Sequence, residues 1–150
     1  MKRTSLFAAA LFLVMVLALP VHPAYADNPE ITVYKTPTCG CCVKWVDHLK
    51  ANGFNVTVQD LADLASIKQQ FSVPSDLQSC HTASVGGYTI EGHVPADDIK
   101  KLLAEKPKAR GLAVPGMPVG SPGMEMGDRK DPYKVILYGE KGQQTVYASH

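Results

Sequence analysis

The order of apolar and polar residues predicts that the chain begins with a strand, a helix and a second strand. Residues 31–35 (Ile-Thr-Val-Tyr-Lys) are a β-branched and aromatic run typical of a strand. After Cys42 apolar residues recur with helical spacing up to residue 52, and the expected buried stripe consists of Val43, Trp45, Val46 and Leu49. Residues 54–59 alternate again and run into a short helix over residues 61–71. Two strands joined through a helix are expected to be parallel.

A hairpin and a third helix are expected in the middle of the chain. Residues 82–85 and 88–91 have strand character and are separated by Gly86 and Gly87, a pair that favours a two-residue hairpin turn. Pro95 then opens a helix, because proline is favoured at the first helical turn and acidic residues follow it.

The stretch over residues 111–127 has a different composition. It contains five glycines, three prolines and three methionines in 17 positions, which allows neither a regular helix nor a central strand. We therefore expect a long, shaped loop. After it, residues 133–138 are the last clear strand, and residues 145–147 are expected to pair with it across the turn at residues 139–142.

The first 26 residues are typical of a secretory signal peptide. Two basic residues precede an apolar run over residues 6–19, and Ala24-Tyr25-Ala26 fits a small-x-small cleavage site. The run is shorter than the roughly 20 residues that a membrane span needs, so an uncleaved anchor is the weaker alternative. We expect residues 1–26 to be removed and residues 27–150 to form one exported domain without membrane insertion.

The charge balance argues against a nucleic-acid partner. Of the 15 Lys and Arg residues two lie within residues 1–26, whereas all 14 Asp and Glu residues follow, so the mature chain has a net charge near −1. That balance gives no electrostatic footprint for nucleic acid or for an anionic membrane surface. The function must therefore be sought in local chemistry.

Four cysteines, all within residues 27–150, provide that chemistry. Cys39 and Cys42 have the C-x-x-C spacing that places two thiols at the first turn of a helix, where backbone N–H groups and the helix dipole favour the thiolate. A redox dithiol needs only these two, so Cys41 is surplus. The side chains of the adjacent Cys41 and Cys42 leave the backbone in different directions, so both cannot easily bind one tetrahedral zinc ion. Three thiolates placed in this way favour a site in which they bridge several soft ions such as Cu(I).

Two alternatives remain open for the cysteines. An exported chain normally carries disulfides, so structural bridges are the default, although a bridge between the adjacent Cys41 and Cys42 would be strained. The second alternative is a thiol-disulfide oxidoreductase in which Cys39 attacks and Cys42 resolves the mixed disulfide.

Residues 31–44 resemble the active-site strand and helix start of glutaredoxins, and residues 85–92 resemble their later hairpin. This resemblance implies a thioredoxin-like α/β fold, with a glutaredoxin-type βαβ unit followed by the hairpin and helix, to which this chain adds the Gly/Pro/Met-rich loop and a C-terminal strand. In glutaredoxins a Val-Pro pair precedes the hairpin, with the proline facing the active-site cysteines. Cys80 and His81 occupy the matching positions, so the resemblance places Cys80 within reach of the other cysteines.

Longer motifs resemble the exported CopG-like copper-resistance proteins over nearly all of the mature chain. They are Cys39-Gly-Cys-Cys42, Ser79-Cys-His-Thr82, Glu91-Gly-His-Val-Pro95 and the run from Gly111 to Glu125. The resemblance implies a periplasmic copper-binding protein of copper homeostasis or resistance, whose partners are copper ions and other exported copper-handling proteins. It also implies that the cysteines Cys39, Cys41, Cys42 and Cys80 hold one Cu(I) ion or a cluster of several, with a redox role left open.

Histidines and methionines supply further candidate ligands. His81 directly follows a cysteine, but adjacent side chains diverge, so a role in supporting a ligand is the alternative. Met117 has a soft thioether that needs no deprotonation, although methionine more commonly fills gaps in a core. We expect His93 at the surface or capping a helix, His48 on a polar helix face away from the cysteines, and His150 at a mobile terminus.

Overall fold

A seven-stranded mixed sheet organises the chain in the computed structural model, which describes residues 28–150. In sequence order the strands are β1 (Glu30–Lys35), β2 (Asn55–Asp60), β3 (Thr82–Val85), β4 (Tyr88–Glu91), β5 (Gly111–Ala113), β6 (Lys134–Tyr138) and β7 (Gln144–Ser149). The helices are α1 (Gly40–Ala51), α2 (Ala65–Gln70) and α3 (Ala96–Glu105), with short 3-10 turns at Ser75–Leu77 and Glu140–Gly142. The predicted signal peptide at residues 1–26 lies outside the described residues.

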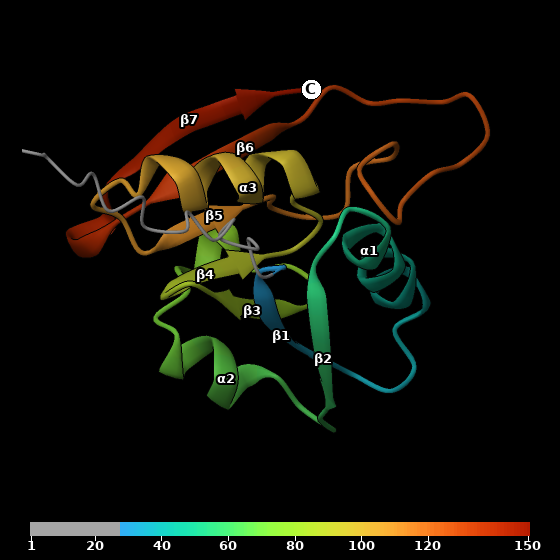
Figure 1. Ribbon diagram of the computed structural model, residues 1–150, viewed down its shortest axis with the longest axis horizontal. Coiled ribbons are helices and arrows are strands. Elements are labelled where there is room, and N and C mark those ends of the chain that lie inside the picture. Colours follow the sequence, from blue (N-terminus) through green and yellow to red (C-terminus); the bar gives the residue numbers. More distant parts are fainter. Residues whose placement is uncertain (1–27) are drawn as a thin grey trace, which may run out of the picture.

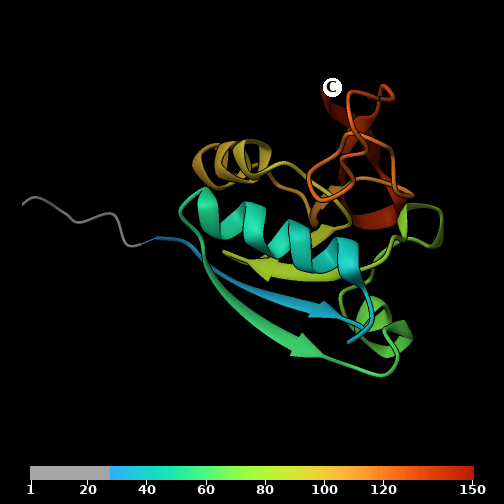
Figure 2. The same cartoon turned by 90° about the vertical axis from the view of Figure 1, so that its right-hand side faces the viewer.

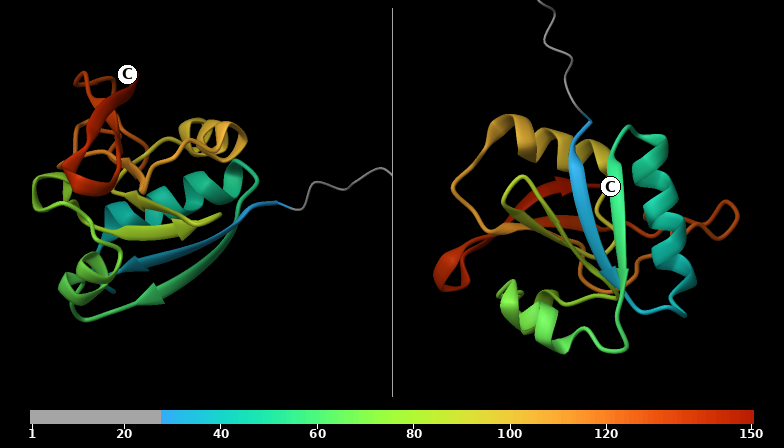
Figure 3. Two further views of the ribbon diagram at one scale, coloured as in Figure 1. Left: turned by 90° about the vertical axis from the view of Figure 1, so that its left-hand side faces the viewer. Right: turned by 60° about the horizontal axis from the view of Figure 1, so that its bottom comes forward.

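Strand order within the sheet is β2-β1-β3-β4-β5-β6-β7. β1 and β2 are parallel and joined through α1, as predicted, and Figure 3 shows them running side by side in the same direction. The predicted hairpin is also confirmed, because β3 and β4 are antiparallel with Val85 opposite Tyr88 and Thr82 opposite Glu91. This hairpin register brings the residues before β3 alongside those after β4.

The helices cover the sheet unequally. α1 and α3 lie together on one face (Figure 2), whereas α2 lies beyond β3 and β4 on the side away from α3 (Figure 1). The main core lies under α1 and α3 and includes Trp45, Leu49 and Ile99, each of which is fully buried. Burying each such apolar side chain contributes about 1.5–3 kcal/mol. No helix within residues 28–150 has the length and apolar character needed to cross a membrane.

The buried stripe of α1 differs from the predicted one at one position. Trp45, Val46 and Leu49 are buried as expected, but Val43 is 44% exposed. The buried residue of the first turn is instead Cys42, which lies three residues before Trp45 and so on the same side of the helix. The cysteine end of α1 is therefore anchored in the core through the side chain of Cys42.

Two predicted elements need correction. The run at residues 111–127 was expected to contain no central strand, yet β5 pairs parallel with β4 and antiparallel with β6. Gly111 permits this pairing, because a Cβ there would lie 1.7 Å from the Thr89 carbonyl oxygen. The helix predicted over residues 61–71 begins only at Ala65. The backbone N–H of Ala65 donates a hydrogen bond to the Asp63 carboxylate at 3.1 Å.

The C-terminal end is fixed, contrary to the expected mobility of His150. β7 pairs antiparallel with β6, as predicted. Beyond it, the backbones of His150 and Tyr133 bond in both directions at 3.0 Å, and their rings stack at 5.1 Å. The His150 imidazole also lies 2.8 Å from the Asp98 carboxylate of α3. The expected mobility is therefore wrong, because these contacts come from residues distant in sequence.

Candidate metal centre

Three of the four cysteines lie at the N-terminal end of α1. Cys39 precedes the helix with extended backbone angles, and Cys41 and Cys42 lie in its first turn. No side chain caps this end and no acidic residue lies in the first turn. Free backbone N–H groups at a helix start favour negative charge, so this end of α1 stabilises thiolates.

Cys80 joins these three from the segment before β3. Its Sγ lies 4.0 Å from the Sγ of Cys41, which in turn lies 3.5 Å from that of Cys39. The Cys42 sulfur is 3.8 Å from the Cys80 carbonyl oxygen. All four sulfur atoms lie within 4.8 Å of one another. Two stretches about forty residues apart in sequence therefore converge, as the alignment with glutaredoxins predicts.

The cysteines are divided into a bridged pair and a free pair. Cys39 and Cys42 form a disulfide, and Cys41 and Cys80 are free and half-buried. Opening the disulfide takes two electrons and yields two thiolates, because the S–S bond breaks without loss of any atom. The protein in this state therefore offers two sulfur donors, and the two-electron reduced protein offers four.

His93 is part of the site, which corrects its expected place at the surface or as a helix cap. The side chain is fully buried, and its Nε2 lies 3.1 Å from the Cys80 sulfur. Its Nδ1 donates to the Pro122 carbonyl oxygen at 2.8 Å, so the lone pair is on Nε2 and faces Cys80. The register of the predicted hairpin could have placed His93 in the site. Thr82 pairs with Glu91, and when this pairing is continued two residues further, Cys80 lies opposite His93.

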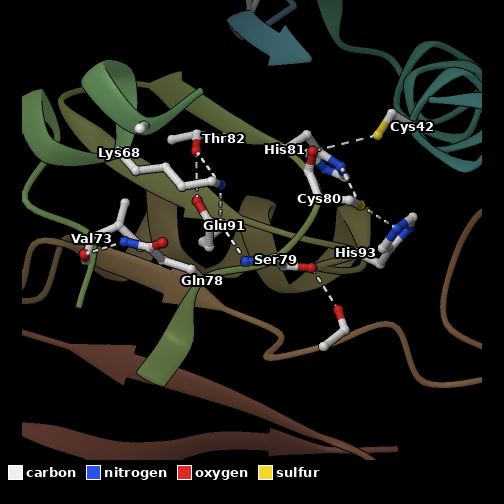
Figure 4. Close-up of polar contacts among 12 residues, drawn as sticks. Cys42, Lys68, Val73, Gln78, Ser79, Cys80, His81, Thr82, Glu91 and His93 are labelled. Atoms are coloured by element: carbon white, nitrogen blue, oxygen red, sulfur yellow. Dashed lines mark hydrogen bonds and ion pairs between the residues drawn. The ribbon is translucent and has the colours of Figure 1, made fainter. Parts of the chain in front are cut away.

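His81 packs beneath the same group. Its Nδ1 is 3.4 Å from the Cys80 sulfur, and its ring lies 4.3 Å from that of Trp45 and 5.0 Å from that of His93. Its buried Nε2 has no hydrogen-bond partner among residues 28–150. Figure 4 shows both imidazoles directed toward Cys80. Burial lowers the pKa of both histidines, that of His81 well below its usual value. Neutral imidazole is the form that binds metals.

Burial also acts on the Cys80 thiol. It raises the pKa of Cys80 to about 12, with the neighbouring Cys41 adding to the effect. At neutral pH the thiol therefore keeps its proton. Since the thiolate is the ligand form, a metal ion that binds Cys80 must displace that proton.

The Gly/Pro/Met-rich loop lies over the start of α1 (Figure 2). At Gly123 (φ +87°) a Cβ would lie 2.7 Å from the Cys41 carbonyl oxygen and 2.9 Å from the Trp45 nitrogen. Only glycine allows so close an approach. Met117 lies on the same loop with 52% of its surface exposed, and its role as a ligand stays a prediction.

His48 lies away from the cysteines, as expected. Its Nε2 accepts a hydrogen bond from the N–H of Ala96 at 3.1 Å, so it supports the start of α3. Burial lowers the pKa of this imidazole as well. His48 therefore offers a half-buried histidine outside the cluster for comparison with His93.

Fold and site together define a mixed α/β protein whose helix start and hairpin entry join sulfur and imidazole donors. A family model described as "Protein of unknown function, DUF411" matches residues 77–124. Two solved structures titled "Copper resistance protein copG", Form 2 and Form 1, are 48% and 50% identical, with TM-scores of 0.79 and 0.77. They cover 83% and 81% of this chain, and the matches span 99% and 96% of theirs. No curated protein matches the chain. The chain belongs to the CopG family of copper resistance proteins.

Proposed function

We propose that this protein binds copper as Cu(I) through Cys39, Cys41, Cys42 and Cys80, with His93 as a further ligand. The observation that carries the proposal is the convergence of four sulfur atoms within 4.8 Å of one another. Disulfide exchange needs only two of these four cysteines. The titles of the related structures name copper resistance, and this supports copper as the cargo.

The donor set favours Cu(I) among metal ions. Thiolate and imidazole are soft and intermediate donors, and Cu(I) accepts low coordination numbers that suit cysteines unable to close one tetrahedron. The adjacent Cys41 and Cys42 can each serve a different ion. We therefore infer a thiolate-bridged cluster of more than one copper ion in the reduced protein, and a smaller capacity when Cys39 and Cys42 are bridged.

The wider setting of this function is also a proposal. We infer a thioredoxin-like fold from the order of β1, α1, β2, α2, the hairpin and α3, with β5 to β7 and the covering loop as additions. We further propose that residues 1–26 direct export and are removed, so that residues 27–150 act in the periplasm. Its partners there are copper ions and other exported copper-handling proteins.

An anaerobic Cu(I) titration of the fully reduced protein tests the proposal. The expected result is an ultraviolet thiolate-to-copper band that saturates at a fixed stoichiometry above one. Changing Cys41 or Cys80 to serine should lower that stoichiometry, whereas changing Ser84, a half-buried residue of β3, to alanine should leave it unchanged. A featureless titration of the reduced wild-type protein would contradict the proposal.

Thiol-disulfide exchange is a second candidate, favoured by the disulfide between Cys39 and Cys42. In that case Cys39 attacks a substrate disulfide and Cys42 resolves the intermediate, so Cys41 and Cys80 are dispensable. Reduction of insulin or of glutathione disulfide that survives Cys41→Ser and Cys80→Ser would favour the enzyme. Loss of copper uptake in the same variants without such turnover would favour the metal site.

A further inference from the structure

A buried ion pair lies beside the segment that carries Cys80. Lys68 of α2 and Glu91 of β4 are 7% and 0% exposed, and the Lys68 Nζ lies 2.5 Å from the Glu91 Oε1. Figure 4 shows the two side chains directed toward each other on one side of residues 79–82, with Cys80 and His93 on the other side. The pair was not expected from the sequence, in which Lys68 belongs to the polar positions of a short helix.

The Glu91 carboxylate accepts hydrogen bonds from both ends of this segment. Its Oε1 accepts from the backbone N–H of Ser79 at 2.6 Å, and its Oε2 accepts from the Thr82 hydroxyl at 2.7 Å. Lys68 also donates to the Thr82 hydroxyl oxygen at 3.1 Å. Ser79 and Thr82 enclose the cysteine and the histidine between them, so one carboxylate fixes a four-residue segment at both of its ends.

Stability alone does not account for the pair. Removing two charges from water costs several kcal/mol per ion, and replacing a buried pair with apolar residues is often neutral or stabilising. Burial raises the pKa of Glu91, and the charge of Lys68 opposes that change together with hydrogen bonds from Lys68, Thr82 and Ser79. The geometry shows what the pair does: the two carboxylate oxygens of Glu91 accept from Lys68, Ser79 and Thr82, so the pair holds the segment in place.

We propose that Glu91, paired with Lys68, is a positioning residue that sets the distance between Cys80 and the cysteines of α1. The inference rests on the proposed copper site, since Cys80 is the sulfur donor that the second stretch of chain brings to it. The Cys80 and Cys41 sulfur atoms are 4.0 Å apart. Because a displacement of about 1 Å can reduce the performance of a site about a hundredfold, anchoring this segment decides whether one ion reaches both sulfurs.

Crosslinking of the two free thiols tests this positioning without any metal. In protein that retains the Cys39–Cys42 disulfide, dibromobimane becomes fluorescent when it bridges Cys41 and Cys80. The test variants are Lys68→Met/Glu91→Met, which removes both charges, and Thr82→Val, which removes one anchor without changing side-chain shape. Thr89→Val is the matched control, because Thr89 is also buried on β4 and lies two residues from Glu91.

The expected result is bridging about tenfold slower in the double variant and about threefold slower in Thr82→Val, with Thr89→Val unchanged, since neighbouring-group reactions depend steeply on geometry. Circular dichroism and thermal unfolding show whether the double variant is folded. Wild-type bridging in a folded double variant would overturn the proposal. If the double variant does not fold, the test is the comparison of Thr82→Val with its control Thr89→Val. Equal bridging rates in these two variants would overturn the proposal.

The same variants in the anaerobic Cu(I) titration connect positioning to copper. Folded variants that bridge slowly should also bind Cu(I) about tenfold more weakly, as expected when a residue that orients a metal ligand is lost. Wild-type protein that takes up no Cu(I) would contradict the proposed function and leave the crosslinking result standing. Slow bridging with wild-type copper affinity would instead contradict the link between Glu91 and the copper site.

Discussion

The two halves of the candidate metal centre are built in different ways. The start of α1 presents three cysteines, Cys39 at the N-cap and Cys41 and Cys42 in the first turn, of which Cys39 and Cys41 are half-exposed. The Cys39–Cys42 disulfide of this half opens to two sulfur donors when it is reduced. The segment before β3 presents Cys80 on a backbone held by Glu91 and Lys68. One half can therefore alter its number of donors while the other keeps a fixed position, which suits a site that gains and loses soft ions.

The largest expected effect on stability comes from a change in the fixed half of the site, which is the Cys80 segment held by Glu91 and Lys68. Glu91→Met leaves the buried ammonium of Lys68 without its partner, and such an unpaired charge destabilises a protein by about 3–5 kcal/mol. Urea unfolding of the metal-free protein measures this loss. Cys41→Ser, on the adaptable half, should change the free energy of unfolding by less than about 1 kcal/mol.

Adding Lys68→Met to Glu91→Met sharpens that comparison. The double variant should recover most of the lost stability, because no buried charge remains. A double variant that is as unstable as Glu91→Met would mean that the carboxylate stabilises the fold through Ser79 and Thr82 alone.

A second prediction concerns Cys80 as the ligand of the fixed half. Cys80→Ser should lower Cu(I) affinity about a hundredfold, corresponding to about 2.8 kcal/mol, because the hydroxyl is a hard donor that stays protonated. Competition with a chromophoric Cu(I) chelator measures the affinity. Equal affinity of Cys80→Ser and wild-type protein would place copper on the helix cysteines alone.

His93 should have a smaller effect than Cys80. His93→Gln removes an imidazole beside the Cys80 sulfur, and we expect Cu(I) affinity to fall about tenfold, within the range for groups that complete or orient a metal site. His48→Gln is the control, because His48 is a half-buried histidine that contacts Ala96 at the start of α3 and lies outside the cysteine cluster. An equal loss in both variants would mean that histidine burial, and not donation to the metal, is responsible.

The smallest effect should be seen in thiol reactivity. Because burial raises the pKa of Cys80 to about 12, its thiolate fraction rises about tenfold per pH unit up to pH 10 without levelling off. Iodoacetamide labelling followed by peptide mass spectrometry should show this slope in metal-free protein. In the Cys41→Ser variant, Cys80 should be labelled a few times faster, because Cys41 contributes to the raised pKa of Cys80. A plateau near pH 8 would contradict this account.

Local signals in the sequence predicted most of the fold. The parallel β1–β2 unit, the hairpin at Gly86 and Gly87 and the β6–β7 pair were all found, because each depends on residues close together in the chain. β5 was missed, since a glycine that permits close strand pairing has the same local signature as a glycine in a loop. The ordered position of His150 was missed because its partners, Tyr133 and Asp98, are distant in sequence.

The parts of the candidate site that depend on cysteine spacing or on the alignment with glutaredoxins could be predicted from the sequence. C-x-x-C spacing placed Cys39 and Cys42 together, and the alignment with glutaredoxins placed Cys80 beside them. His93 was recoverable in principle from the hairpin register. The Lys68–Glu91 pair was not, because polar residues in a short helix and a strand normally face water, and only the packing of α2 against β3 and β4 brings these two together.

X-ray absorption at the copper edge tests most directly the claim that sulfur atoms from both halves hold the same copper. For the reduced, Cu(I)-loaded protein the account predicts a first shell dominated by sulfur, with a short copper-to-copper distance that is lost in Cys80→Ser. A shell made only of nitrogen and oxygen, or a spectrum that Cys80→Ser leaves unchanged, would contradict it.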